Sequence, residues 1–273
     1  MTITDWDDAY ANRDHVPDAP AILEALPRDA QAFRDRMSAQ GRARLGVAYG
    51  AGARQLYDLF LPEAESPKGL VVFVHGGYWR LFDRTYWSHY ATGALAHGWA
   101  VAMVQYTLCP EASIAGIGTE VAAGIAAAAG EVPGPIRLAG HSAGGHLVTR
   151  AMCSDSALPE SVAARVAHTL SISGVHDLRP LIRTAMNEDL KLTLESAAAE
   201  SPALLLPRNG ARVTAWVGDI ERPEFVRQST LLANIWTGLG ADMAQVKAPG
   251  RHHFDVIDGL LDPDSQMMRT LLG

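Results

Sequence analysis

Cysteine is scarce in this 273-residue sequence: only Cys109 and Cys153 occur, in unrelated segments. Two cysteines cannot form a disulfide framework for a chain of this size, so we expect a reducing compartment. No apolar run approaches the roughly 18 residues that a membrane span needs, and the acidic residues 1–8 lack the apolar centre of a secretory signal. We therefore expect a cytoplasmic protein with no membrane partner.

Basic residues are also fewer than acidic residues. The sequence has 23 Lys and Arg residues against 30 Asp and Glu residues, giving a formal net charge of −7. Nucleic-acid binding requires clustered Lys and Arg side chains that neutralise phosphates, and this balance argues against it. The densest basic stretch, residues 34–44, is interpreted as the solvated face of a helix.

Hydrophobic residues make up 48% of the chain and charged residues 19%, as in ordinary globular proteins. Short β-branched and aromatic runs alternate with helical segments. This pattern predicts an α/β fold, with a mostly parallel, twisted sheet and helices on both faces. The predicted strands are residues 55–61, 70–74, 100–104, 136–139, 169–173 and 213–217, with a weaker candidate at 243–246. The predicted helices are residues 86–98, 111–130, 144–153 and 224–239.

Two segments do not follow this alternation. Residues 1–45 are rich in Ala, acidic residues and Arg, with a helical composition at 30–44, and we interpret them as an N-terminal helical arm. Residues 176–209 are polar and Leu-rich with proline breaks, and we interpret them as a partial lid above the sheet. No linker or repeat divides the chain, so residues 1–273 are predicted to form a single domain.

The sequence Gly-His-Ser-Ala-Gly at residues 140–144 matches the G-x-S-x-G pattern between a predicted strand and a predicted helix. In that context, a strained turn exposes the serine hydroxyl above the sheet. Gly140 and Gly144 are expected because Cβ atoms would collide across the turn. The pattern therefore predicts Ser142 as a nucleophile that attacks a carbonyl carbon.

The sequence His-Gly-Gly-Tyr-Trp at residues 75–79 directly follows the predicted strand 70–74. Attack on a carbonyl creates a negatively charged oxygen, which preorganised N–H groups stabilise. We predict Gly77, Tyr78 and Ala143 as these oxyanion donors. His75 is interpreted as an anchor of the loop.

A serine nucleophile needs a base, usually histidine, and an acid that orients it. His252 and His253 follow the last strand candidate and are both candidates for the base. Asp219 and Glu221 follow the predicted strand 213–217 and are both candidates for the acid. The residue types alone do not choose between the members of either pair.

These motifs resemble those of the kynurenine formamidases (arylformamidases), a family of the α/β-hydrolase fold related to hormone-sensitive-lipase-like esterases. Residues 75–79 and 140–144 are similar to that family's H-G-G-Y-W and G-H-S-A-G. Residues 217–229 resemble its V-G-x-x-D-S-P-E-F-x-R-Q-S, and residues 253–255 its H-F-[DE]. Leu190 to Glu195, followed by Ser201 and Pro202, also has a counterpart.

The resemblance implies an α/β-hydrolase fold with Glu221 as the acid and His253 as the base. The chain departs from the family pattern at the acid, where Glu stands for Asp at 221 and Arg for Ser at 222. Asp219 therefore remains an alternative acid. His252 remains an alternative base.

The implied reaction is hydrolysis of N-formyl-L-kynurenine to kynurenine and formate, with no metal or organic cofactor. Trp79 either stacks on the aryl ring of the substrate or forms an aromatic wall against the lid. A broad short-chain carboxylesterase would use the same groups, and a hydrolase fold kept only for binding is a third possibility. In each case the expected partner is a small molecule, and the oligomeric state is left open.

Overall fold

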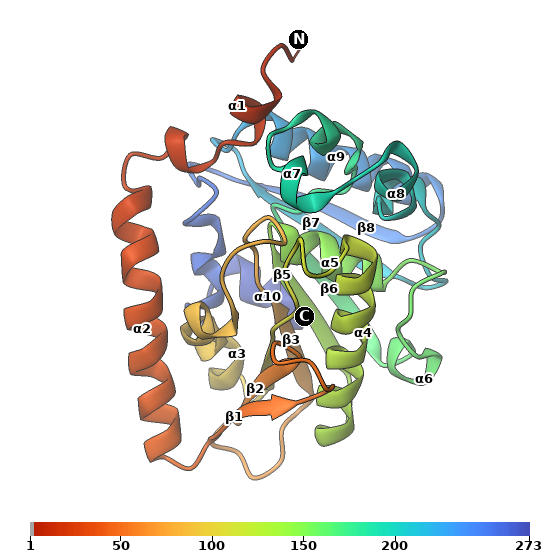
Figure 1. Ribbon diagram of the computed structural model, residues 1–273. Coiled ribbons are helices and arrows are strands. Elements are labelled where there is room, and N and C mark those ends of the chain that lie inside the picture. Colours follow the sequence, from red (N-terminus) through yellow and green to blue (C-terminus); the bar gives the residue numbers. More distant parts are fainter. Residues whose placement is uncertain (1–2) are drawn as a thin grey trace.

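An eight-stranded sheet runs through the structure, which is a computed structural model describing residues 3–273 (Figure 1). Its strands are β1 (Ala43–Ala48), β2 (Leu56–Phe60), β3 (Leu70–Val74), β4 (Ala100–Val104), β5 (Ile136–His141), β6 (Val166–Ile172), β7 (Arg212–Gly218) and β8 (Asp242–Ala248). Their spatial order is β1-β2-β4-β3-β5-β6-β7-β8. β2 runs antiparallel to β1 and β4, and the other neighbours are parallel. The predicted, mostly parallel sheet is confirmed.

The strand predictions succeed where the strands are buried on both faces. β3 and β4 coincide with predicted residues 70–74 and 100–104, and all ten of their residues are buried. β1 was not predicted, because it is an edge strand with mostly exposed residues and therefore carries no apolar run. β8, at the opposite edge and also largely exposed, extends beyond the weak candidate at 243–246.

Helices cover both faces of the sheet, as predicted (Figure 1). The α-helices are α1 (Trp6–Tyr10), α2 (Ala19–Ala39), α3 (Thr92–Ala96), α4 (Ile114–Glu131), α5 (Ala143–Ala151), α6 (Glu160–Ala163), α7 (Asn187–Leu190), α8 (Leu194–Ala199), α9 (Pro223–Gly238) and α10 (Gln266–Leu272). The 3-10 helices are η1 (Arg13–His15), η2 (Arg84–Tyr86), η3 (Ser88–Ala91), η4 (Arg179–Arg183), η5 (Pro202–Leu204) and η6 (Val256–Leu260).

Alternate residues of β3 belong to two hydrophobic cores. Leu70, Val72 and Val74 pack in the core formed with α4, α5 and α9. Val71 and Phe73 pack in the other core, with α2, α3 and α10. Since successive side chains of a strand point to opposite faces, a continuous apolar run is what a strand between two helical layers requires.

Two of the helix predictions need correction. The segment predicted as one helix at 86–98 consists of η2, η3 and the short α3. Its many aromatic residues favour a helix only weakly. The helix predicted at 30–44 belongs to α2, which begins at Ala19 and ends at Ala39, and the chain then turns into β1.

The basic stretch at residues 34–44 is only in part the solvated helix face that we predicted: Arg36 is exposed on α2, whereas Arg42 and Arg44 lie beyond the end of the helix. Arg34 is buried and forms an ion pair with Asp58, a fully buried residue of β2. Arg84 donates from Nε to the second oxygen of Asp58 at 2.8 Å, and the N–H of Gly46 donates to that same oxygen at 2.7 Å. A carboxylate in the middle of an apolar strand is stable only with such partners.

The segment between β6 and β7 contains η4, α7, α8 and η5 and adds no strand to the sheet. Figure 1 shows α7 at the same end of the molecule as α1. Its action as a lid stays a prediction, as does the assignment of the chain to a single domain. Within residues 3–273, no helix is both long and apolar enough to cross a membrane.

We expect Asp58→Asn to lower the free energy of unfolding by about 3–5 kcal/mol, because it leaves two arginines buried without their counter-charge. The matched control is Arg44→Ala, which breaks an exposed pair with Glu131 and should cost at most about 1 kcal/mol. Urea unfolding followed by circular dichroism measures both. Equal losses in the two variants would contradict the structural role of Asp58.

Candidate active site

Ser142 lies at the sharp turn between β5 and α5. Its backbone adopts φ 55° and ψ −118°, a strained conformation for a residue other than glycine. A Cβ atom on Gly140 would lie 2.2 Å from the carbonyl oxygen of Gly144, and one on Gly144 would lie 1.9 Å from that of Val74. The two glycines therefore permit the turn, as the sequence motif predicted.

The loop after β3 contacts this turn directly. A Cβ atom on Gly76 would lie 3.0 Å from the Cβ of Ser142, so the loop backbone passes beside the serine. Among residues 3–273, no hydrogen-bond acceptor is paired with the backbone N–H of Gly77, Tyr78 or Ala143. These N–H groups are therefore free to donate to a ligand oxygen, and their role as oxyanion donors stays a prediction.

His75 fixes the start of this loop. Its ring stacks on Tyr106 with centroids 4.4 Å apart, and the Tyr106 hydroxyl donates to the His75 carbonyl oxygen at 3.0 Å. Burial lowers the pKa of His75 to about 4, so its imidazole is neutral at pH 7. These contacts agree with the interpretation of His75 as an anchor.

His253 and Glu221 form a buried hydrogen-bonded pair. Nδ1 of His253 donates to Oε2 of Glu221 at 2.7 Å. The other oxygen, Oε1, accepts from the hydroxyl of Ser173 at 2.6 Å and from the N–H of Gly218 at 2.7 Å. Both carboxylate oxygens are therefore held by donors, and the one-methylene difference between Glu and Asp is accommodated at residue 221.

His252, the alternative base, and Asp219, the alternative acid, form hydrogen bonds outside the pair of His253 and Glu221. Nδ1 of His252 accepts from the backbone N–H groups of Phe254 and Asp255, both at 3.2 Å, and so stabilises its own turn. Asp219 is exposed and accepts from the N–H of Gly250 at 2.7 Å. Neither residue lines the pocket that contains Ser142.

Two functional-site residues escaped the sequence analysis. The Ser173 hydroxyl donates a hydrogen bond to Glu221. Its position at the carboxyl end of a predicted strand was the sequence feature that could have identified it as a site residue. His141, which precedes the serine, is buried, and its Nε2 donates to the carbonyl oxygen of His253 at 2.9 Å. Burial holds the pKa of His141 well below its usual value, so this ring is neutral. His141 thus links the serine turn to the histidine loop.

Ser142 and His253 line one pocket of about 460 Å³. Aromatic side chains form much of its wall, and the N-terminal arm contributes several residues between 7 and 23. Its lining is Asp7, Tyr10, Ala11, Asn12, Arg13, Asp14, Leu23, Gly77, Tyr78, Arg80, Leu81, Phe82, Trp87, His141, Ser142, Met186, His253 and Phe254.

Trp79 does not line this pocket, which argues against the first of its two interpretations, stacking on a substrate ring, while the aromatic wall against the lid stays a prediction. Its side chain is fully buried and packs edge-on against His146, with ring centroids 5.1 Å apart. The backbone of Trp79 has φ 59°, directly after Tyr78 at φ 51°. Two successive left-handed residues turn the Trp79 side chain into the core while Tyr78 stays at the pocket.

Polar contacts fix the arm to the oxyanion loop and to α9. The Tyr78 hydroxyl donates to the carbonyl oxygen of Tyr10 at 2.5 Å and accepts from Nδ2 of Asn12 at 2.9 Å. Burial raises the pKa of Tyr78 to about 12, which keeps this donor protonated. The Tyr10 hydroxyl in turn donates to Glu224 of α9 at 2.7 Å.

Arg222, where the chain departs from the resembled motif, adds to this attachment. Its Nε donates to the carbonyl oxygen of Asp8 at 3.1 Å, and its Nη2 pairs with the Asp8 carboxylate. The Asp8 carboxylate also pairs with His15 at 2.7 Å. The substituted residue therefore binds the arm, and it does not displace Glu221 from His253.

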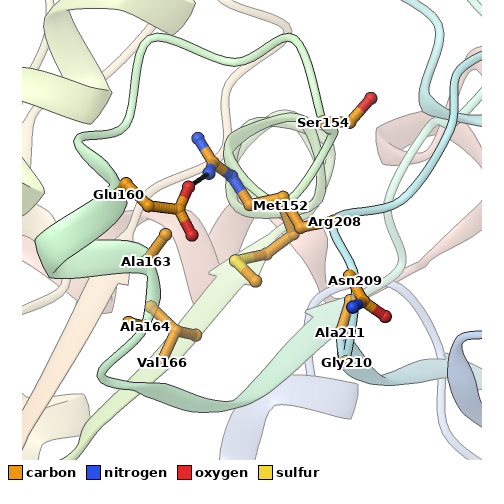
Figure 2. A pocket seen from close by; sticks show the side chains of 10 residues that line it. All are labelled: Met152, Ser154, Glu160, Ala163, Ala164, Val166, Arg208, Asn209, Gly210 and Ala211. Atoms are coloured by element: carbon orange, nitrogen blue, oxygen red, sulfur yellow. Dashed lines mark hydrogen bonds and ion pairs between the residues drawn. The ribbon is translucent and has the colours of Figure 1, made fainter.

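A second pocket, of about 330 Å³, shares no lining residue with the first. Figure 2 shows Arg208 reaching toward Glu160 across it, and these two charges pair at 2.5 Å. Its other lining residues are small, apolar or uncharged, and no histidine lies among them. It therefore offers no histidine as a base, and its one carboxylate, Glu160, is paired with Arg208.

Within the described residues 3–273, no group of three or more His, Cys, Asp or Glu side chains is placed to hold a metal ion. The prediction of a cofactor-free reaction stays a prediction.

Comparisons with known proteins agree with this architecture. The model of the alpha/beta hydrolase family matches residues 71–269. A kynurenine formamidase from Salmo salar is 27% identical over 94% of this chain and 90% of its own length, and one from Danio rerio is 26% identical over 93% and 89%. The predicted resemblance to kynurenine formamidases is confirmed.

A crystal structure of a candidate thioesterase from Silicibacter sp. TM1040 is also similar. It is 47% identical to this chain and superimposes with a TM-score of 0.94, covering 98% of this chain and 99% of the other. The family model spans most of the chain, and its fold agrees with the sheet order, the serine turn and the pocket. The chain therefore belongs to the alpha/beta hydrolase family, and it is a hydrolase.

Proposed function

We propose that this hydrolase cleaves the formamide of N-formyl-L-kynurenine, using Ser142, His253 and Glu221 as a catalytic triad. The observation that carries the proposal is the buried hydrogen bond between His253 and Glu221, in a pocket that His253 shares with Ser142. The similarity to kynurenine formamidases supports the choice of substrate.

In the first step, Ser142 attacks the formyl carbon while Nε2 of His253 accepts the hydroxyl proton. Glu221 holds Nδ1 of the ring and stabilises the imidazolium that forms. The N–H groups of Gly77, Tyr78 and Ala143 stabilise the negative charge on the formyl oxygen. Because these donors are unpaired and held by a buried loop, little reorganisation is needed when the charge develops.

In the second step, the protonated His253 donates its proton to the departing aryl amine, leaving a formyl ester on Ser142. Water then attacks this ester while His253 accepts one of its protons; the bond between the formyl carbon and the Ser142 oxygen breaks, His253 returns the proton to that oxygen, and formate leaves. The aromatic residues Phe82, Trp87 and Phe254 line the pocket and suit an aryl leaving group. Every step therefore uses groups that this chain supplies.

The second candidate is a short-chain esterase, which would use the same serine, histidine and acid. It is favoured by the 47% identical relative described as a candidate thioesterase. The walls of the pocket, rather than the triad, determine which acyl compound is accepted. The two functions are therefore separated by substrate preference.

The first prediction for this proposal concerns substrate preference. We expect kcat/KM for N-formylkynurenine to exceed that for p-nitrophenyl acetate and for an acetyl thioester, measured on one enzyme preparation.

Ser142→Ala should lower kcat on all three of these substrates by about 10⁴-fold or more, because the nucleophile is removed. A fluorophosphonate probe should label the wild-type protein at Ser142. Absence of labelling would indicate a binding protein without turnover.

The second prediction tests the acid. Glu221→Gln should lower kcat by about 10³- to 10⁴-fold, because an amide cannot stabilise the imidazolium and can hold the wrong tautomer. Asp219→Asn serves as the matched control and should stay within about threefold of wild type, as expected for an exposed residue away from the pocket. A larger loss in Asp219→Asn than in Glu221→Gln would reassign the acid.

A further inference from the structure

Arg80 combines a charged side chain, a position at the pocket and unused hydrogen-bond donors. It follows the oxyanion loop, and its backbone N–H donates to the carbonyl oxygen of Gly77 at 3.0 Å. Its side chain lines the pocket that contains Ser142. The turn therefore holds Arg80 at a fixed position relative to the oxyanion donors.

The guanidinium of Arg80 is only partly satisfied by the protein. Nη1 donates to Oδ2 of Asp189, on α7, at 2.6 Å. Within residues 3–273, Nε is buried and has no hydrogen-bond partner, and no acceptor is paired with Nη2. A buried donor atom that is left unpaired is costly unless a ligand completes it.

The unused donors of Arg80 share one edge of the guanidinium. Nε–H and one N–H of Nη2 point in parallel from the planar group, in the geometry that binds both oxygens of a carboxylate. Asp189 accepts from Nη1, which lies outside this edge. It only partly offsets the positive charge of Arg80, because the side chains of Arg80 and Asp189 are 33% and 41% exposed to solvent. A carboxylate that reaches this edge, once a small shift of the Arg80 side chain uncovers Nε, would therefore bind without displacing Asp189.

We propose that the Nε and Nη2 edge of Arg80 binds a carboxylate of the substrate and so selects aryl substrates that carry an amino-acid group. This inference rests on the proposed function and names the part of the substrate that lies away from the reacting bond. The carboxylate of N-formylkynurenine has the required chemistry. Asp7 and Asp14 line the same pocket from the arm, so acidic groups are present for the ammonium of such a substrate.

The test compares two substrates that differ only in this group: N-formylkynurenine and its primary carboxamide. Wild type should prefer the acid by about 30- to 100-fold in kcat/KM, as expected for a two-point, charge-assisted contact. In Arg80→Met, this preference should fall below about threefold, mainly through a higher KM for the acid. Release of the aryl amine, followed by absorbance, gives each rate.

Asp189→Asn is the matched control, because it removes the negative charge that pairs with Arg80 and leaves the Nε and Nη2 edge intact. We expect this variant to keep the preference for the acid. An unchanged preference in Arg80→Met would overturn the inference. Equal losses on both substrates in Arg80→Met and Asp189→Asn would also overturn it, because Arg80 would then serve only to hold α7.

A second substrate pair separates this inference from the proposed function. O-acetyltyrosine and O-acetyltyrosinamide are aryl esters that differ in the same carboxylate. If wild type cleaves neither formamide but prefers O-acetyltyrosine in an Arg80-dependent manner, the formamidase assignment fails and the carboxylate site stands. If wild type shows no preference within either pair, the carboxylate site fails whichever bond is cleaved.

Discussion

The turn between β5 and α5 lies so close to the end of β3 that no side chain fits between them. A Cβ on Gly144 would stand 1.9 Å from the carbonyl oxygen of Val74, the last residue of β3. This close approach brings the loop after β3 alongside Ser142. The serine, the unpaired N–H groups and the pocket depend on that one backbone contact, because each is positioned by one of the two segments.

The carboxylates of Asp58 and Glu221 are both buried, but their partners differ in charge. Asp58 is surrounded by two arginines and a backbone N–H, and these contacts join α2, β2 and η2. Glu221 is held by neutral donors from Ser173 and Gly218 and by the ring of His253. The first carboxylate is neutralised by permanent charges. The second is bound by neutral donors and by one imidazole, which is the arrangement that the proposed triad requires.

The buried strands and the serine turn could be predicted because their signals are local. β3 and β4 appear as continuous apolar runs, and the turn appears as glycines at fixed spacing around Ser142. β1 gave no such signal, since an exposed edge strand can have almost any composition. The pairing of Arg34 with Asp58 was missed because 24 residues separate them. The apolar residues that flank Asp58 were the only local indication that its charge is buried.

Residue types and their order defined the site only in part, and the family resemblance then selected Glu221 as the acid and His253 as the base. The order of serine, acid and histidine narrowed the acid and the base to two candidates each. Asp219 and Glu221 are two residues apart, and only the direction in which each side chain leaves the loop after β7 distinguishes them. The two interpretations of Trp79 could not be separated for a related reason, because the left-handed backbone that turns its side chain into the core has no signature in a non-glycine residue.

The N-terminal arm forms part of the pocket wall, and this affects how the substrate preference of the enzyme can change in evolution. Residues 7–14 contribute to the cavity, yet they are joined to the rest mainly through Tyr78, Glu224 and Arg222. None of these attachments involves the sheet or the serine turn. Sequence drift at the arm residues that do not contact Tyr78 can therefore reshape the pocket wall while Ser142, Glu221 and His253 stay fixed, so that substrate selectivity can change without a change in chemistry.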